Sequence, residues 1–272
     1  MNLDYRASAF VVSVPHDEHN GCLHLVTAKH VAIRLQRGEA VIAFNGKDGL
    51  PLWMSNGDRV PWFFHPDETV DVAILPMASL RLNEYDYQDI STNLFLTSAR
   101  SEEYEIGCGD DVFTIGLFTP FTGVLRFTPI VRTGVIAMMP DGRVHHPEFG
   151  SMEAYLTESR SLGGLSGSPV FVRDTVSVQG VNTEGKPRPF SAPAGFHLLG
   201  LLSGHWDAPG TTRHSAGLNM GISLVVPAAK ILEALSSPSL TALREEAFQR
   251  GLIPEASNVG QSTQEISCDG EG

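Results

Sequence analysis

Short apolar runs separated by glycine, proline and polar turns make up most of the chain. Runs of this length and spacing are typical of β-strands. They predict strands at 8–14, 22–27, 41–44, 50–54, 71–76, 111–116, 122–127, 129–138, 154–157, 170–172, 176–181 and 197–203. Residues 79–106 are polar and irregular, which indicates a connection between two halves, and residues 182–195 form a Pro/Gly-rich excursion. The pattern therefore predicts an all-β protein of the barrel or sandwich type.

The hydrophobic period changes near the C-terminus. Residues 225–235 predict a helix in which Pro227 suits the first turn, and Ile231 and Leu235 share an apolar face. Helical spacing returns over 239–250, and Gly251 follows where a C-terminal cap is expected. Residues 253–272 have little to bury, so we expect a disordered tail.

The composition indicates which classes of partner are excluded and in which cellular compartment the protein is expected. A net charge of −12 argues against nucleic acid and anionic membranes as partners. No apolar run approaches the ~18 residues of a membrane span, and the N-terminus lacks the basic start of a signal peptide. Three widely spaced cysteines predict no disulfide framework. We therefore expect a cytoplasmic protein that does not bind membranes.

Five histidines lie in two groups along the sequence, and histidine is a common metal ligand. His16, His19 and His24 lie close in sequence, but strand alternation and the intervening loop do not present them as one preformed set. His145 and His146 follow a polar turn, and we expect them in a solvated loop. The sequence therefore predicts no metal site and no cofactor.

The densest chemical signal is the Gly/Ser stretch 161–170. Glycine-rich backbone lets amide N–H groups face a ligand beside a free serine hydroxyl, as acyl transfer requires. A plain Gly/Ser surface turn is the alternative. Two further residues stand out, because His30 ends an apolar strand and Asp71 heads another. An aspartate at a buried position needs hydrogen-bond donors, so Asp71 either caps a turn or orients a histidine.

His30, Asp71 and Ser166 follow the chain order of one known serine triad. The segment 26–31 resembles the "TAAH" histidine segment of trypsin-like peptidases, and 70–75 resembles their "D-[IV]-A-[LV]-[LV]" aspartate segment. Residues 164–170 resemble "G-D-S-G-G-P-[LV]", and 199–204 resemble the strand that lines the substrate cleft. The chain thus resembles the chymotrypsin/trypsin-like serine peptidases, in particular their disulfide-free bacterial branch.

This resemblance implies two antiparallel six-stranded barrels with the site between them, and a C-terminal helix. Its domains would be 1–100 with His30 and Asp71, 101–235 with Ser166, and 236–272 as a short helix and tail. It implies that Ser166 attacks a peptide carbonyl while His30 acts as general base and Asp71 holds its tautomer. The amides of Gly164 and Ser166 would form the oxyanion hole.

The chain departs from the family pattern at several positions. Leu165 replaces the aspartate that, in secreted relatives, pairs with a new N-terminus freed by cleavage. With few residues before the first strand as well, we expect no zymogen cleavage of that type. Ser168 replaces a glycine, and Lys29 beside His30 is either solvated or lowers the basicity of the histidine. By resemblance, the candidate substrate-binding residues are Arg160, Ser203, Gly204 and His205, and Arg160 would favour an acidic side chain if it lies in the pocket and not on the surface.

The leading hypothesis is an intracellular serine endopeptidase that acts on protein or peptide substrates. A catalytically silent domain that binds peptides or partners is one alternative. An esterase that uses the same triad is another. A regulatory partner protein is left open, because 239–250 and the tail offer a surface but no specific signal.

Overall fold

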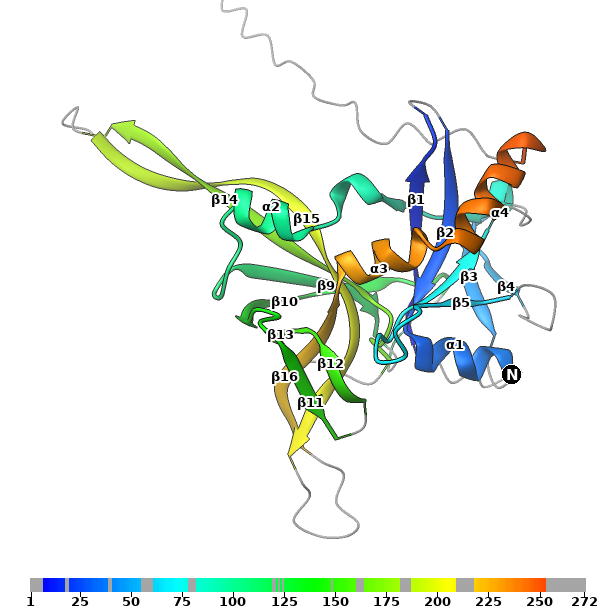
Figure 1. The fold of residues 1–272 in the computed structure, drawn as a ribbon, viewed down its shortest axis with the longest axis horizontal. Coiled ribbons are helices and arrows are strands. Elements are labelled where there is room, and N and C mark those ends of the chain that lie inside the picture. The colour runs from blue at the N-terminus through cyan, green and yellow to red at the C-terminus, as the bar shows by residue number, and fades with distance from the viewer. Residues whose placement is uncertain are drawn as a thin grey trace, which may run out of the picture.

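The structure of the chain is a computed structural model. The residues described are 7–17, 20–38, 41–54, 61–77, 82–118, 121, 123, 125–147, 149–159, 164–181, 187–208 and 218–252. Figure 1 shows a strand-rich body in which two helices near the C-terminus lie across the strands. The predicted tail at 253–272 and Arg160 fall outside the described residues.

The elements follow one another in a mostly β order. They are β1 (Phe10–Pro15), β2 (Gly21–Thr27), α1 (Lys29–Gln36), β3 (Ile42–Gly46), β4 (Pro51–Met54), β5 (Phe63–Phe64), β6 (Ala73–Pro76), η1 (Leu82–Glu84), β7 (Tyr85–Asp86), β8 (Asp89–Ser91), η2 (Thr92–Leu94), α2 (Ser98–Glu103), β9 (Asp111–Leu117), β10 (Pro129–Met138), β11 (Arg143–His146), β12 (Gly150–Glu153), β13 (Tyr155–Glu158), β14 (Pro169–Val181), β15 (Pro187–Ala208), β16 (Leu218–Pro227), α3 (Ala228–Leu235) and α4 (Pro238–Gln249). The predicted all-β class and the C-terminal helix are confirmed.

The C-terminal half contains a closed barrel. Its strand order is β10-β13-β16-β15-β14-β9, and every pairing around it is antiparallel. Apolar side chains such as Leu165, Val170 and Leu199 fill one of the core clusters associated with these strands. Closure removes free sheet edges except where one strand runs past its neighbour, and β15 does so near the candidate site.

The N-terminal half is built from two sheets. One has the order β5-β6-β2-β1-β8 and the other the order β4-β3-β7. The pairing of β1 with β8 is parallel, which the antiparallel expectation did not include. Leu25, Ala32, Leu75 and neighbouring apolar residues form a core cluster here. The closed barrel of the C-terminal half is therefore confirmed, while a second closed barrel and the domain boundaries stay predictions.

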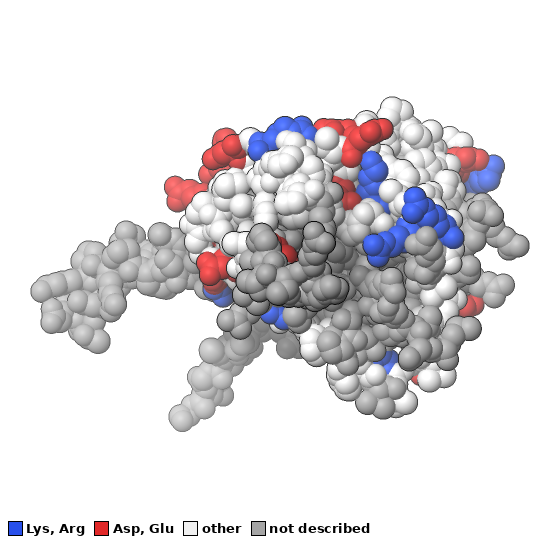
Figure 2. Space-filling view, turned by 90° about the horizontal axis from the view of Figure 1, so that it is seen from below, with Lys and Arg blue, Asp and Glu red and all other residues white. Residues whose placement is uncertain are grey.

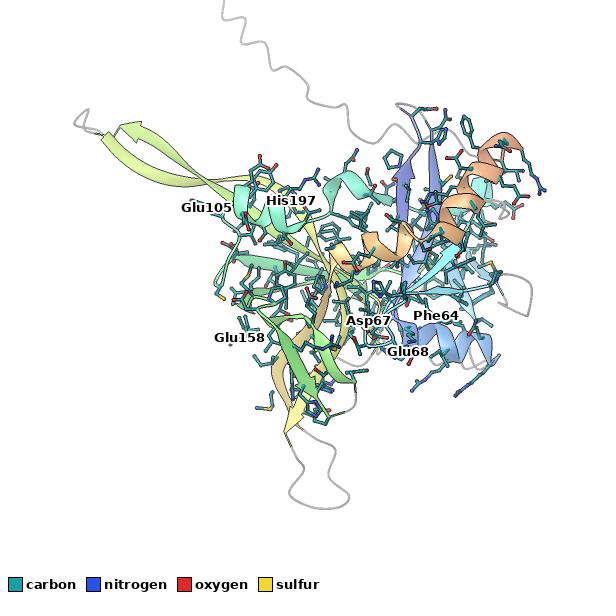
Figure 3. All side chains as sticks on the ribbon, in the orientation of Figure 1. Phe64, Asp67, Glu68, Glu105, Glu158 and His197 are labelled. Atoms are coloured by element: carbon teal, nitrogen blue, oxygen red, sulfur yellow. The ribbon has the colours of Figure 1, made fainter. Side chains whose placement is uncertain are left out.

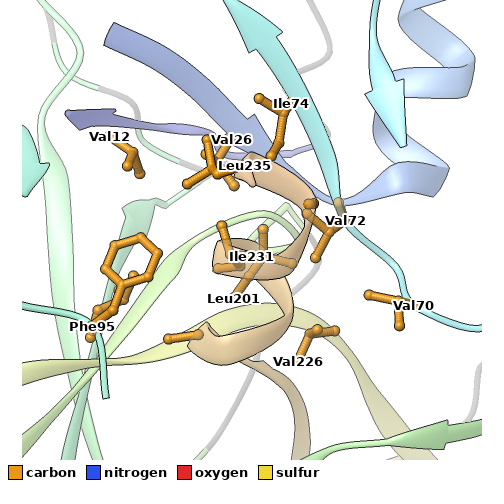
Figure 4. Close-up of a cluster of buried hydrophobic side chains, with 14 of the residues drawn as sticks. Val12, Val26, Val70, Val72, Ile74, Phe95, Leu201, Val226, Ile231 and Leu235 are labelled. Atoms are coloured by element: carbon orange, nitrogen blue, oxygen red, sulfur yellow. The ribbon is translucent and has the colours of Figure 1, made fainter. Parts of the chain in front are cut away.

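Helix α3 lies where the two halves meet. Its buried residues Ile231 and Leu235 share a cluster with Val26 and Ile74 of the N-terminal sheet and with Leu201 of the barrel. Figure 4 shows these side chains surrounding the helix from both sides. Because burial of apolar area is the main favourable term in folding, this cluster ties the two halves together.

The structure differs from the sequence predictions at four places. Residues 29–36 form a helix that was not predicted, and residues 125–127 of the predicted strand 122–127 are not in a strand. The expected solvated loop at His145 and His146 is the hairpin β11–β12, in which His146 is buried. Part of the Pro/Gly-rich excursion, 187–195, belongs to the long strand β15. At His146 and over 187–193, burial or hairpin pairing overrode the local signal.

The surface carries charges of both signs. In Figure 2, Lys and Arg side chains lie beside Asp and Glu, and no continuous basic surface covers the described part of this face. Among the described residues, no helix is long and apolar enough to cross a membrane. The described cysteines, Cys22 and Cys108, are free. The expected absence of nucleic-acid and membrane partners and the expected cytoplasmic location stay predictions.

Candidate active site

His30 lies in the first turn of α1, directly after the buried strand β2. The helix starts because the Ala28 carbonyl accepts hydrogen bonds from the amides of Val31 and Ala32. This turn places the His30 ring beside Asp71, with its Nδ1 2.8 Å from Asp71 Oδ2. The His30 backbone amide also donates to Asp71 Oδ1 at 3.0 Å. The carboxylate therefore fixes both the position of the residue and the tautomer with a proton on Nδ1.

Asp71 lies in the short connection before β6, and its side chain is largely buried. Burial by itself raises the pKa of its carboxyl. The hydrogen bonds from His30 and Ser203, together with the charge of His30, outweigh burial and leave the pKa below its ordinary value. Asp71 is thus an ionised carboxylate at neutral pH that faces the imidazole.

Ser203 connects Asp71 with Ser166. The Ser203 hydroxyl donates to Asp71 Oδ2 at 2.5 Å, and the Ser203 carbonyl accepts the hydroxyl of Ser166 at 3.1 Å. The Ser203 side chain is buried and turned toward Asp71. The Ser203 hydroxyl is thus bonded to Asp71, while the predicted substrate contact of Ser203 stays a prediction. The three residues of the predicted triad are therefore gathered around one residue of β15.

The nucleophile loop turns sharply around Ser166. Gly164 and Gly167 have φ angles of 97° and 87°, a region that favours glycine. The Ser168 amide donates to the Leu165 carbonyl at 2.9 Å, which closes the turn. Ser168 is fully buried, whereas Ser166 retains exposure. Of the two serines, only Ser166 can meet a substrate.

The side chains of Lys29 and His205 contact residues outside the triad. Lys29 directs its Nζ to the Glu68 carbonyl at 3.2 Å and over the Phe64 ring, 5.9 Å from its centroid. Figure 3 shows Phe64 and Glu68 grouped near the start of α1. The His205 side chain pairs with Asp207, with 3.3 Å between Nε2 and Oδ1. The predicted contact of His205 with substrate stays a prediction.

Two aromatic side chains beside the site, Phe149 and His146, were not predicted from the sequence. The Phe149 ring lies 5.5 Å from the His30 ring, centroid to centroid, and 4.8 Å from the His146 ring. A Cβ added at Gly204 would lie 2.4 Å from Phe149 Cε2, so glycine at 204 makes room for this ring. His146 Nε2 donates to the His205 carbonyl at 3.2 Å, which holds the β11–β12 hairpin against β15. The one sequence signal of this arrangement is Gly204, which stands where the trypsin-like peptidases usually have an aromatic residue.

A second histidine–carboxylate pair lies outside this site. His197 Nε2 is 3.3 Å from Asp174 Oδ2, and the His197 ring stacks on Tyr104 at 4.6 Å between centroids. Figure 3 shows His197 close to α2, on the far side of the barrel from Phe64.

Comparisons with known proteins identify structural neighbours only. No protein-family model matches the sequence, and no curated protein matches it. The fold is similar to the solved structure of Deg5 (17% identity, TM-score 0.42, 83% of this chain and 79% of that chain). It is also similar to the inactive form of the Rv3671c protease (16%, TM-score 0.42, 85% and 82%) and to chymotrypsin from Cellulomonas bogoriensis (13%, TM-score 0.36, 84% and 87%). At these values the similarity assigns no role to any residue of this chain.

Proposed function

We propose that this chain is a serine endopeptidase of the trypsin-like type, in which His30, Asp71 and Ser166 form the catalytic triad. The observation that carries the proposal is the joint position of these residues around Ser203. Asp71 accepts hydrogen bonds from His30 Nδ1 and from Ser203, and Ser166 donates to the Ser203 carbonyl. A nucleophile, a base and a carboxylate that orients the base are the parts required for acyl transfer.

The proposed reaction follows from these contacts. Asp71 holds the Nδ1 proton, which leaves His30 Nε2 as the base. The Ser166 hydroxyl rotates about χ1 from the Ser203 carbonyl to Nε2 and attacks the substrate carbonyl as its proton moves to His30. His30 then gives the proton to the leaving amine, and water hydrolyses the acyl-enzyme. The amides of Gly164 and Ser166 stabilise the oxyanion, each contributing about 3 kcal/mol to the barrier reduction.

The part of β15 that runs beyond β14 supports a peptide as the substrate. Pairing between β14 and β15 ends at Pro169 and Leu201, while β15 continues to Ala208. Residues 203–205 therefore pass Ser166 with β16 on one side and without β14 on the other, and the His205 carbonyl accepts from His146. An extended peptide can add to such a strand through main-chain hydrogen bonds, which brings a peptide carbonyl beside the nucleophile.

Labelling with a fluorophosphonate probe tests the proposal. We expect rapid labelling of the wild-type chain, loss of the label in Ser166→Ala, and retention of it in Ser168→Ala as the matched control. No label on the folded wild type would refute an assembled triad and favour a silent peptide-binding domain. Turnover of esters without cleavage of any peptide in a mixed library would favour an esterase.

The substrate preference is a separate proposal. Arg160, proposed to favour acidic side chains, lies outside the described residues. Replacing it with glutamine and profiling a peptide library tests that role, and an unchanged profile would remove it. The free thiols of Cys22 and Cys108 fit the proposed intracellular location.

A further inference from the structure

Ser8, two residues before β1, contacts the nucleophile loop on the side away from the Ser166 hydroxyl. The Ser8 amide donates to the Ser166 carbonyl at 2.8 Å, and the Ser8 hydroxyl donates to the Gly164 carbonyl at 3.2 Å. Both bonds span more than 150 positions of sequence. The Ser8 hydroxyl also lies 3.4 Å from the Leu117 amide of β9 and accepts from it. One small residue thus joins the N-terminal segment to the loop and to the barrel wall.

The same residue reaches the histidine side of the site. The Ser8 carbonyl accepts the hydroxyl of Thr27 at 2.8 Å, and Thr27 is buried at the end of β2. His30 follows Thr27 by three positions, in the first turn of α1. Ser8 therefore links the strand that delivers the base to the loop that carries the nucleophile.

These bonds fix the peptide groups around Ser166. A trans peptide is planar, and its N–H points opposite to its carbonyl. Ser8 holds the carbonyls of Gly164 and Ser166, and the Ser168 amide holds the carbonyl of Leu165 between them. The Leu165 carbonyl shares its peptide plane with the Ser166 amide, so the bond from Ser168 sets the direction of that amide. The two bonds from Ser8 hold the peptide planes on either side of it. That amide is one of the two proposed oxyanion donors.

Gly167 packs so closely against Ser8 and Thr27 that a side chain at position 167 would not fit. A Cβ added at Gly167 would lie 2.0 Å from the Ser8 carbonyl oxygen and 2.4 Å from Thr27 Oγ1. Leu165 is buried in the apolar cluster of the barrel, so its side chain offers no charge to an ion pair. The loop is therefore held by neutral hydrogen bonds to Ser8 and by burial of Leu165.

We infer that Ser8 is a positioning residue for catalysis, which tethers the nucleophile loop so that its amides are oriented before substrate binds. This inference rests on the proposed peptidase function for its effect on rate, and on the contacts alone for the tether. Ser8 does not touch the reacting atoms. It acts through Gly164 and Ser166.

The test compares Ser8→Ala with Ser8→Thr, which keeps the hydroxyl, and with Ser13→Ala on the neighbouring strand as the control. The concentration dependence of fluorophosphonate labelling separates the maximal rate from the half-saturating concentration. Removing a whole oxyanion donor costs about 10²–10³ in rate, so loosening one should cost about tenfold. We expect that loss in Ser8→Ala with an unchanged half-saturating concentration, recovery in Ser8→Thr, and no effect in Ser13→Ala.

Thr27→Val is a second variant that removes the bond to the Ser8 carbonyl with little change of shape. A smaller fall in the maximal rate is expected. Hydrogen exchange of residues 164–168 should become faster in Ser8→Ala, and this readout needs no activity. A labelling rate within twofold of the wild type in Ser8→Ala would overturn the positioning role while the peptidase proposal stands.

A wild type that takes no label would defeat the peptidase proposal and the effect on rate. Hydrogen exchange would then decide the tether, and unchanged exchange at 164–168 in Ser8→Ala would overturn it as well.

Discussion

Replacing Ser203 with alanine removes a hydrogen bond to a buried carboxylate. Asp71 Oδ2 accepts both from Ser203, at 2.5 Å, and from His30 Nδ1, at 2.8 Å. A hydrogen bond to a charged group contributes about 1.5–3 kcal/mol, and burial prevents water from replacing the lost donor. We therefore expect Ser203→Ala to lower the free energy of unfolding by about 1.5–3 kcal/mol at pH 7.

Guanidinium chloride denaturation at pH 7 measures this loss. Ser223→Ala is the matched control, because Ser223 is equally buried but its hydroxyl bonds only to Ser159, a neutral partner. A neutral hydrogen bond contributes about 1 kcal/mol. If Ser203→Ala costs no more than Ser223→Ala, Asp71 is not the buried carboxylate that the contacts indicate.

The same variant should change the acid dependence of stability in a defined direction. The hydrogen bond from Ser203 contributes to the lowered pKa of Asp71, so its removal raises that pKa toward the ordinary value. A carboxyl whose pKa is lowered by folding stabilises the fold above its unfolded pKa, and this contribution is lost as the pH falls through the folded pKa. The loss of unfolding free energy on acidification should therefore be smaller in Ser203→Ala than in the wild type. An equal or larger loss would contradict the contribution of Ser203 to the pKa of Asp71.

Three further predictions concern stability. Burial, with a smaller effect of Arg244, lowers the pKa of His24 from 6.5 to about 4, so the unfolded chain binds a proton first as pH falls. About 3 kcal/mol should be lost between pH 6.5 and 4, and denaturation at pH 7 and 4.5 should show a shallower pH dependence in His24→Leu. Ile231→Ala empties a site between the two halves and should cost about 3 kcal/mol in the same assay; a loss below about 1 kcal/mol would contradict that packing. Gly204→Ala should cost about 1–3 kcal/mol through collision with the Phe149 ring, and the double variant with Phe149→Ala should recover part of it; additive effects of the two substitutions would exclude the collision.

Local sequence was sufficient where one signal dominated. The apolar runs predicted most barrel strands, because a strand that packs on a core must carry apolar residues over a short length. The spacing of Ile231 and Leu235 predicted α3. The contexts of His30, Asp71 and Ser166 predicted a triad, and the structure brings these residues around Ser203. Their catalytic roles stay a proposal that labelling decides.

The helix at 29–36 and the hairpin at 143–153 were not predicted, for a physical reason that they share. Each depends on partners distant in sequence: His30 on Asp71, and His146 on the carbonyl of His205. A polar residue that is buried by a remote strand looks the same in sequence as one in a solvated loop. Periodicity carries no information about that difference.

The sequence by itself determined the residue types of the site and the strands that carry them. Only the tertiary structure decided which residues support the site. Ser203 hydrogen-bonds to Asp71, Phe149 packs against Gly204, and Ser8 hydrogen-bonds to the loop that carries Ser166. Apolar burial is non-directional and leaves a repeating pattern along the chain. A hydrogen bond between residues far apart leaves none, because it depends on distances and angles that exist only after the chain has folded.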